Sequence, residues 1–318
     1  MLPNVSQPRT SDHVPVLAEE VRARLAVRPG ETVVDATFGA GGHSRLLAAD
    51  LEGRGKLIAI DRDPSVRSYF DRFKGSAGVQ ARLLRGEFSL VLGQLAANDV
   101  QADAILLDLG VSSMQLDRPE RGFSYAADAP LDMRMDASSE LTARDLVNDA
   151  EERELALLFR RYGEERYARP IARAIVRRRA ERPFERTSDL AETIKHAIPT
   201  PARFGEGHPA KRVFQALRIA VNDELGALEA ALPAAVRMLR PGGRLAVISF
   251  HSLEDRIVKQ FIRTEARGCT CPPDFPICVC GNEPLLRDLT RKPVRPSARE
   301  VQQNPRSASA KLRVAVKT

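Results

Sequence analysis

Short apolar runs alternate with helical segments in the first part of the chain. Four runs predict short buried strands, at residues 32–35, 56–60, 82–84 and 104–107. Helices are predicted at 16–25, before the first run, and at 44–51, after it. Alternating strands and helices are typical of an α/β fold with a doubly wound parallel sheet. In such sheets ligands bind at the carboxyl ends of the strands, where the strand order reverses.

The alternation stops after the fourth predicted strand. The next strong strand is 244–250, and a helix at 221–239 supplies the crossover that leads to it. The surplus residues before this helix predict further helices, at 143–147, 151–162, 168–180 and 188–196, with Thr187 or Ser188 as a cap for the last. We therefore expect a helical domain inserted at the carboxyl end of the sheet, where it can clamp a substrate.

The expected domains follow from this break in the pattern. Residues 1–115 and 216–318 form the sheet domain, and residues 116–215 form an inserted helical substrate-recognition domain. Near the end, residues 281–310 are rich in Pro, Arg and Ser and predict an irregular surface segment. Residues 311–317 alternate between polar and apolar side chains and predict a closing edge strand.

The composition is ordinary for a soluble globular protein. The 318 residues are 43% hydrophobic and 29% charged, and no apolar run is long enough to span a membrane. The first residues lack the basic and apolar regions of a signal peptide and predict a short loose arm. We therefore expect a cytoplasmic protein that does not associate with membranes.

The net charge of +7 is concentrated in two stretches. Residues 160–186 hold ten arginines against four glutamates, and residues 281–318 hold nine Lys and Arg against three acids. Arginine suits phosphate because its planar guanidinium can form two hydrogen bonds at once. The charge is thus compatible with binding to a nucleic-acid backbone, and equally with a solvated helix face and a basic tail.

A glycine-rich turn follows the first predicted strand. Gly39, Gly41 and Gly42 would let the backbone approach a ligand, and the next helix would present unpaired N–H groups. The spacing differs from the G-x-G-x-x-G of dinucleotide sites. The turn alone could also be a generic glycine turn in an α/β protein.

The side chains at the strand ends favour S-adenosylmethionine as the ligand. Asp35 could accept a hydrogen bond from a cationic amino group, and Asp61 suits the two ribose hydroxyls. Phe88 could lie against the adenine face, and Asp108 could face the methionine end. Four such strand ends in order make a generic glycine turn much less plausible than a methyl-donor site.

All four cysteines fall in one short stretch, Cys269, Cys271, Cys278 and Cys280. Clustered thiols of this number suit tetrahedral zinc, although the spacing is C-x-C rather than C-x-x-C. Reduced thiols in a proline-rich loop, or disulfides formed on oxidation, explain the same cluster. We assign no metal from the sequence.

Several longer stretches resemble the bacterial small-subunit ribosomal RNA (cytosine-N4-)-methyltransferase family. The resemblance covers about 13–312, and its most specific stretches are 35–44 (DATFGAGGHS), 60–64 (IDRDP), 106–113 (LLDLGVSS), 121–124 (RGFS), 130–136 (PLDMRMD), 162–166 (YGEER) and 248–256 (ISFHSLEDR). It implies a class I, Rossmann-like methyltransferase sheet with an inserted helical domain. It also implies methyl transfer from S-adenosylmethionine to the N4 amine of a cytidine in 16S rRNA, near the decoding centre. The family's donor-binding positions correspond to Gly41, Gly42, His43, Asp61, Phe88, Asp108 and Gln115.

Other amino-group methyltransferases often carry a Pro-Pro-aromatic motif after the fourth strand, which is missing here. Some other aromatic side chain must hold the cytosine, and Phe123, Tyr125 and Phe250 are candidates, although each is also a suitable core residue. We call the glycine turn and the polar strand ends at Asp35, Asp61 and Asp108 the donor cradle. No cysteine lies near this cradle in sequence, which argues against methylation at carbon 5.

Four side chains are candidates for the chemistry: Asp108, Ser112, Ser113 and His251. Asp108 is the natural acceptor for the target amine, although it could instead serve only the donor. The two serines and the histidine could hold the base or relay its proton. His251 could equally be a buried, hydrogen-bonded residue at a strand end.

Three other functions compete with this interpretation. A dehydrogenase is disfavoured by the glycine spacing, and a DNA amino-methyltransferase by the missing aromatic motif and by the insertion. A ribosome-assembly protein that binds RNA without chemistry would share the basic stretches but would not need the donor site. We expect 16S rRNA or the small ribosomal subunit as partner, and no DNA. The sequence leaves open which of these two RNA substrates is used, and whether the chain forms a homo-oligomer.

Overall fold

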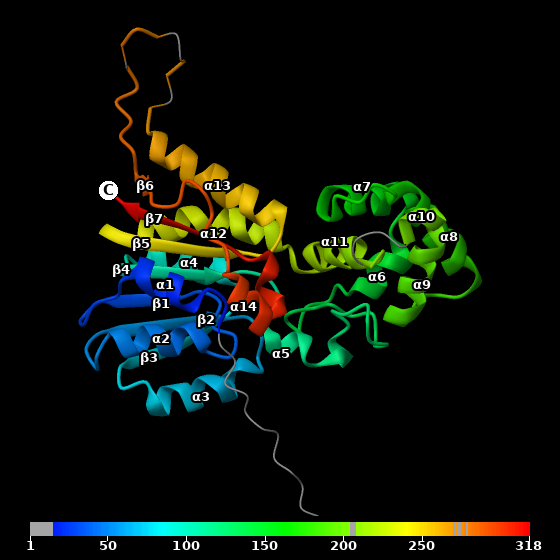
Figure 1. Ribbon diagram of the computed structural model, residues 1–318, viewed down its shortest axis with the longest axis horizontal. Helices are drawn as coiled ribbons and strands as arrows, with labels where there is room; N and C mark the ends of the chain where they lie inside the picture. The colour runs from blue at the N-terminus through cyan, green and yellow to red at the C-terminus, as the bar shows by residue number, and fades with distance from the viewer. Residues whose placement is uncertain (1–14, 204–207, 270, 273–274, 278) are drawn as a thin grey trace, which may run out of the picture.

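The computed structural model describes residues 15–203, 208–269, 271–272, 275–277 and 279–318. The arm expected before residue 15 and Cys278 lie outside them. Seven strands form one sheet in the order β3-β2-β1-β4-β5-β7-β6 (Figure 1). Their bounds are β1 Thr32–Asp35, β2 Lys56–Asp61, β3 Gln80–Arg85, β4 Ala102–Asp108, β5 Leu239–Ser249, β6 Leu286–Asp288 and β7 Lys311–Lys317.

The sheet confirms the predicted fold class. Strands β1 to β5 are parallel, and the order reverses between β1 and β4. Asp35 pairs with Leu106 of β4 and with Ala59 of β2, so the ends of these strands lie side by side. The polar residues that end β1, β2 and β4 therefore meet at one edge of the sheet.

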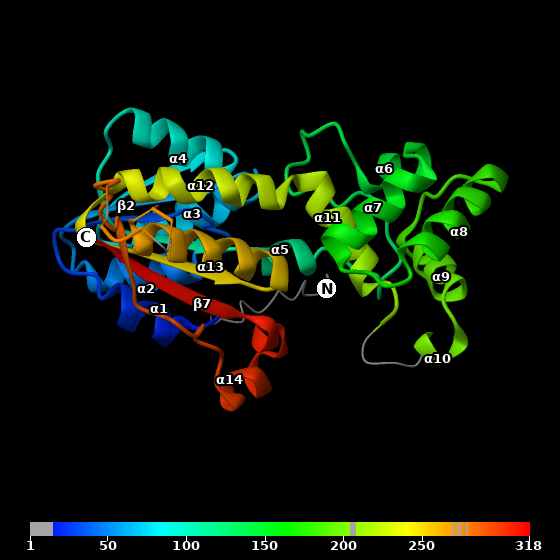
Figure 2. The ribbon, with the colours of Figure 1, turned by 90° about the horizontal axis from the view of Figure 1, so that it is seen from above.

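In the part of the chain that the structure describes, six helices cover the sheet: α1 Ala18–Leu25, α2 Gly42–Asp50, α3 Val66–Ser76, α4 Phe88–Ala97, α12 Glu224–Met238 and α13 Ser252–Arg267. Ile105 and Leu107 of β4 pack into the core beneath α4, α12 and α13. Leu106, which points the other way, packs with α1 and α2. Figure 2 shows α4 and α12 on one side of the sheet and α1 on the other.

A second group of helices lies beside the sheet (Figure 1). It comprises α6 Ala143–Asp149, α7 Glu152–Gly163, α8 Ala168–Glu181, α9 Thr187–Ala197, α10 Thr200–Arg203 and α11 Lys211–Asn222, and is reached from β4 through α5 Ser113–Leu116. Phe159, Ile171, Phe184 and Leu217 are fully buried in a core of its own. No helix within the described residues is long and apolar enough to cross a lipid bilayer.

The structure corrects the prediction for the end of the chain. Residues 311–317 do form a strand, but β7 lies between β5 and β6 and is not an edge. The segment expected to be irregular contains the edge strand β6 and the helix α14 Ala298–Gln303. Alternation of polar and apolar residues reveals that a strand has two different faces, and not how many neighbours it has.

Two helix predictions also need correction. The helix expected at 221–239 is divided at Asp223, which has a φ of 45° and separates α11 from α12. Neither Thr187 nor Ser188 caps α9. The Thr187 hydroxyl donates to the Ala127 carbonyl at 2.8 Å, and the Ser188 hydroxyl donates to Asp128 at 2.6 Å. Both hydroxyls therefore anchor the preceding loop.

Candidate methyl-donor site

The turn after β1 brings the backbone to the strand ends. Gly39 and Gly41 have φ of 54° and 77°, in the left-handed region where glycine is unstrained. A Cβ on Gly41 would lie 2.7 Å from the ring of Phe38, so a side chain does not fit there. Helix α2 begins at once with Gly42, two residues earlier than predicted, and its first N–H groups lie at the same edge of the sheet.

Asp61, at the end of β2, is held by two backbone bonds. The Gly39 N–H donates to Oδ2 at 2.8 Å and the Asp63 N–H donates to Oδ1 at 2.9 Å. Each carboxylate oxygen keeps a further lone pair for a ligand hydroxyl. Burial raises the pKa of Asp61 to about 6, and the charges of Asp63 and Asp35 act in the same direction. Asp61 is therefore an ionised acceptor at neutral pH, and its protonation in mild acid leaves it fewer acceptor sites for a ligand hydroxyl.

Asp35, at the end of β1, is 1% exposed and bonded within the protein. The Ser44 hydroxyl donates to Oδ2 at 2.6 Å, and the Thr37 N–H donates to Oδ1 at 3.2 Å. Burial raises the pKa of Asp35, although the Ser44 bond and the nearby His43 oppose that rise. The carboxyl joins the strand end to the first turn of α2 and lies behind the cradle.

Asp108 and His43 face one another across the cradle. His43 Nε2 lies 3.6 Å from Asp108 Oδ2, and the Asp108 N–H donates to the Thr37 hydroxyl at 2.6 Å. Within the described residues, five buried side-chain polar atoms lack a hydrogen-bond partner: His43 Nδ1, His43 Nε2, Ser65 Oγ, Asp108 Oδ1 and His251 Nε2. Three of them belong to this one pair. Because unpaired buried polar atoms are costly, this pair fits a polar ligand group that completes its bonding.

Gln115 connects the end of β4 to the end of β2. Its Oε1 accepts from the Ser112 N–H at 3.0 Å, and its Nε2 donates to Asp63 Oδ2 at 3.1 Å. Gln115 and Asp63 are 5% and 2% exposed, so this network is shielded from solvent. The turn after β4 is thereby fixed relative to Asp61. Ser113 begins α5, and its side chain lies outside the described part of the structure.

Two of the four candidate aromatic residues lie at strand ends of the sheet. Phe88 is partly buried at the start of α4, in the turn whose Gly86 N–H donates to the Asp61 carbonyl at 3.0 Å. Phe250 follows β5, and a Cβ on Gly110 would lie 3.5 Å from its ring. Tyr125 instead packs against the helical core and stacks on His208, with the ring centroids 4.6 Å apart. Phe123 also contacts that core.

His251 bonds to its own helix rather than to the cradle. It precedes α13, and its Nδ1 accepts from the Glu254 N–H at 3.4 Å, while its Nε2 lies 3.2 Å from Glu254 Oε1. Burial acts to raise the pKa of Glu254, but His251 and the charge of Arg218 outweigh it and lower that pKa. The contacts of His251 are those of a helix cap, which favours its structural interpretation.

Sequence reasoning missed two residues of the site. Asp63 receives hydrogen bonds from Gln115 and from Arg121 Nη1 at 3.0 Å, and Arg121 lies far away in sequence. The Ser65 N–H also donates to Asp63 Oδ1 at 2.9 Å. This bond closes the short turn that the sequence Asp-Pro-Ser favours. The doubled acid in Asp61-Arg62-Asp63 was the available signal, since one carboxylate can bind ligand while the other anchors the loop.

Comparisons with known proteins identify the family of the chain. Residues 10–318 match the model of the MraW methylase family. A protein of Heliobacterium modesticaldum named "Ribosomal RNA small subunit methyltransferase H" is 55% identical, over 96% of this chain and 98% of its own length. Proteins with the same name from Symbiobacterium thermophilum and Geobacter sulfurreducens are 55% and 52% identical, over 96% and 97% of this chain and 96% and 99% of their own lengths.

Proposed function

Because the chain belongs to the MraW methylase family, we propose that it transfers a methyl group from S-adenosylmethionine to the N4 amine of a cytidine in 16S rRNA, near the decoding centre. The chain is a methyltransferase of small-subunit ribosomal RNA, and its substrate is 16S rRNA or the small subunit. The target nucleotide and the residue roles below are proposals. A cytoplasmic location follows from the same proposal.

The unpaired polar atoms of His43 and Asp108 carry the assignment of the donor site. They lie at the strand end beside the glycine turn, where the donor's polar methionine end would bond to His43 and to one lone pair of Asp108 Oδ1, which leaves the second lone pair for the target amine. Asp61 would hold the two ribose hydroxyls, and Phe88 would cover the adenine. Gly39, Gly41 and Gly42 would allow the backbone to lie against the donor. Gln115 and Asp35 would position these groups from behind.

The reaction needs alignment more than activation. When bound, S-adenosylmethionine supplies a methyl group on a positively charged sulfur. The cytosine amine is a weak nucleophile because its lone pair is delocalised into the ring. We propose that Asp108 Oδ1 accepts a hydrogen bond from this amine and draws the nitrogen toward tetrahedral geometry. Phe250, against the Gly110 turn, is then the aromatic residue best placed to stack the base.

Proton removal is assigned to groups at the end of β4. Ser112 and Ser113 follow Asp108 in the same turn and would pass the released proton toward solvent. We assign His251 the role of a positioning residue for the start of α13, because its described contacts are to Glu254.

We propose the helical unit as the substrate-recognition domain. Its core extends to Leu217, and α11 continues to Asn222. This supports a junction near Asn222, slightly beyond the expected boundary at 215. Of the ten arginines between 160 and 186, the exposed ones on α8, Arg169, Arg173 and Arg177, would contact the RNA backbone. The unit lies beside the end of β4, so bound RNA would be close to the donor.

Methyl transfer with labelled donor tests the proposal. Purified protein is incubated with 16S rRNA, with small subunits and with duplex DNA, and the nucleosides are then separated by mass. We expect N4-methylcytidine in an RNA substrate, none in DNA, and none with Asp61→Ala at low donor concentration. RNA binding without any transfer would support a non-catalytic assembly protein instead, and methylated DNA would support the DNA methyltransferase.

A further inference from the structure

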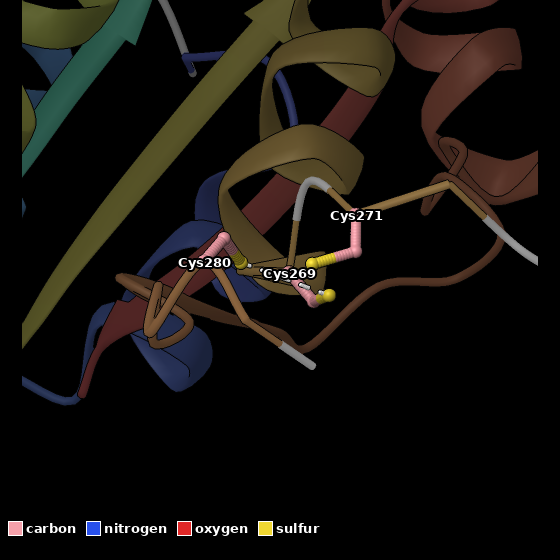
Figure 3. Close-up of side chains that lie close together, drawn as sticks. All are labelled: Cys269, Cys271 and Cys280. Atoms are coloured by element: carbon pink, nitrogen blue, oxygen red, sulfur yellow. Dashed lines mark hydrogen bonds between the residues drawn. The ribbon is translucent and has the colours of Figure 1, made fainter. Parts of the chain in front are cut away.

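Among the described residues, three cysteines meet in the loop that follows α13. Figure 3 shows the side chains of Cys269, Cys271 and Cys280 turned toward one another. Their Sγ atoms all lie within 4.8 Å of one another, and the Sγ atoms of Cys280 and Cys269 are 3.8 Å apart. The loop stands away from both the donor cradle and the helical unit (Figure 1). The proposed methyl transfer does not use it.

The two ends of this loop are held together independently of the thiols. Gly268 has a φ of 66°, and a Cβ there would lie 2.5 Å from the Pro284 nitrogen. The Leu285 N–H donates to the Glu265 carbonyl at 2.9 Å, across the base of the loop. Cys269 follows this base directly. The two ends of the segment that carries Cys271 and Cys280 are therefore held together by backbone packing.

The geometry points to a zinc ion bound by Cys269, Cys271 and Cys280. Zinc binds thiolates at about 2.3 Å in tetrahedral sites, so neighbouring sulfurs are roughly 3.8 Å apart. The Cys280–Cys269 distance already has this value. The third sulfur lies within 4.8 Å of the other two and requires only a small contraction. Thiolates are soft ligands and select zinc over calcium or magnesium.

The zinc would hold an apolar loop tip in place. Phe275, Ile277 and Val279 lie between the second and last cysteines of the cluster and are 52%, 75% and 72% exposed. So much exposed apolar surface gives a loop little packing to stabilise it. The three thiols lose their protons when they bind the ion. The metal cross-link between Cys269, Cys271 and Cys280 then stabilises the loop, which has little apolar packing of its own.

Metal analysis of the full chain tests this site. Protein is purified with reductant and without chelator, and its zinc content is measured by inductively coupled plasma mass spectrometry. We expect one zinc per chain, and its loss in Cys269→Ser/Cys280→Ser. Val279→Ser is the matched control, because it changes the same loop to the same residue and keeps every thiol. The control should retain the zinc.

Three further measurements guard against misfolding and adventitious metal. S-adenosylmethionine affinity should be equal in wild type and in the double variant, since the cradle is remote. Exchange of zinc for cobalt should give the thiolate-to-cobalt charge-transfer absorption, and removal of the metal should speed proteolysis between 269 and 280. Metal-free wild-type protein that gives no such absorption with added cobalt would overturn the proposal. So would zinc retained by the folded double variant.

Discussion

Arg121 Nη1 donates a hydrogen bond to Asp63 Oδ2 at 3.0 Å and so ties the segment after the donor site to the end of β2. The same guanidinium donates from Nη2 to the carbonyls of Arg134 and Met135, at 2.9 and 3.0 Å. Burial acts to raise the pKa of Asp63, but bonds from Ser65 and Gln115 and the charge of Arg121 outweigh it and lower that pKa. One arginine thus fixes both the donor loop and the entry to the helical unit.

We predict that Arg121→Met destabilises the protein by about 3 kcal/mol at neutral pH, because it leaves the Asp63 carboxylate buried without its cation. Denaturant unfolding measures this loss. A lowered pKa in the folded state stabilises the protein above the ordinary aspartate pKa and loses that effect as pH falls. The difference between wild type and Arg121→Met should therefore shrink toward acid pH. Arg118→Met, at an exposed position of the same turn, is the control and should change little.

Donor affinity should depend on pH through Asp61. Its pKa of about 6 means that the charged acceptor for the ribose hydroxyls is replaced by a weaker, protonated one as pH falls through this value. Calorimetric affinity for S-adenosylmethionine should decline below about pH 6 in wild type. Asp61→Ala should bind roughly ten- to a hundredfold more weakly at neutral pH, as expected for losing about 1.5–3 kcal/mol of bonding to a charged group. Its affinity should be flat across this range, and an unchanged affinity in the folded variant would remove Asp61 from the site.

The Asp61 carboxyl also affects the stability of the donor-free protein, but this stability falls as pH rises, whereas donor affinity increases. A pKa raised by folding stabilises the protein at low pH, and this stability is lost as pH rises through about 6. Ionised Asp61 should therefore cost the donor-free protein stability at neutral pH. Bound donor should therefore raise the melting temperature by a larger amount as pH rises through about 6, the range where this group stabilises the donor-free protein less.

Substitution of Asp108 distinguishes a catalytic role of this residue from a role in donor binding. Asp108→Asn should reduce the single-turnover rate at saturating donor and RNA much more than it reduces donor affinity, because a hydrogen bond to the amine strengthens as charge develops on nitrogen. A near-normal rate at saturation would assign Asp108 to donor binding alone.

RNA affinity should depend on the exposed arginines of α8. Arg169, Arg173 and Arg177 are exposed one helical turn apart, whereas Arg178 is partly buried and donates to the Arg182 carbonyl at 2.6 Å. Reversing these three charges to glutamate should weaken RNA binding and flatten its dependence on salt. Donor affinity should stay the same. An equal change of charge at three exposed arginines of the sheet domain, Arg28, Arg54 and Arg72, is the control. Should both triple variants bind RNA alike, α8 is not the contact surface.

The sequence predicted the strand ends well because parallel strands bring their carboxyl ends to one edge. Asp61 and Asp108 could therefore be placed together from local pattern alone. Arg121 could not be placed beside Asp63, because that pair depends on the path of the chain between them. His251 differs, because its partner Glu254 is only three residues away: the His-x-x-Glu spacing at the start of a helix is a local signal for a capping box.

The position of the helical unit also has a consequence for folding. β4 and β5 pair in the centre of the sheet, yet residues 109–238 separate them. Contacts this distant in sequence form slowly, because a long segment must close before they stabilise anything. The intervening helices α6 to α11 pack around their own core, so they can collapse first from contacts close in sequence, whereas α12 packs on the sheet. That collapse would shorten the effective loop between the two strands, so that mutations in the helical core would slow the assembly of a sheet they do not touch.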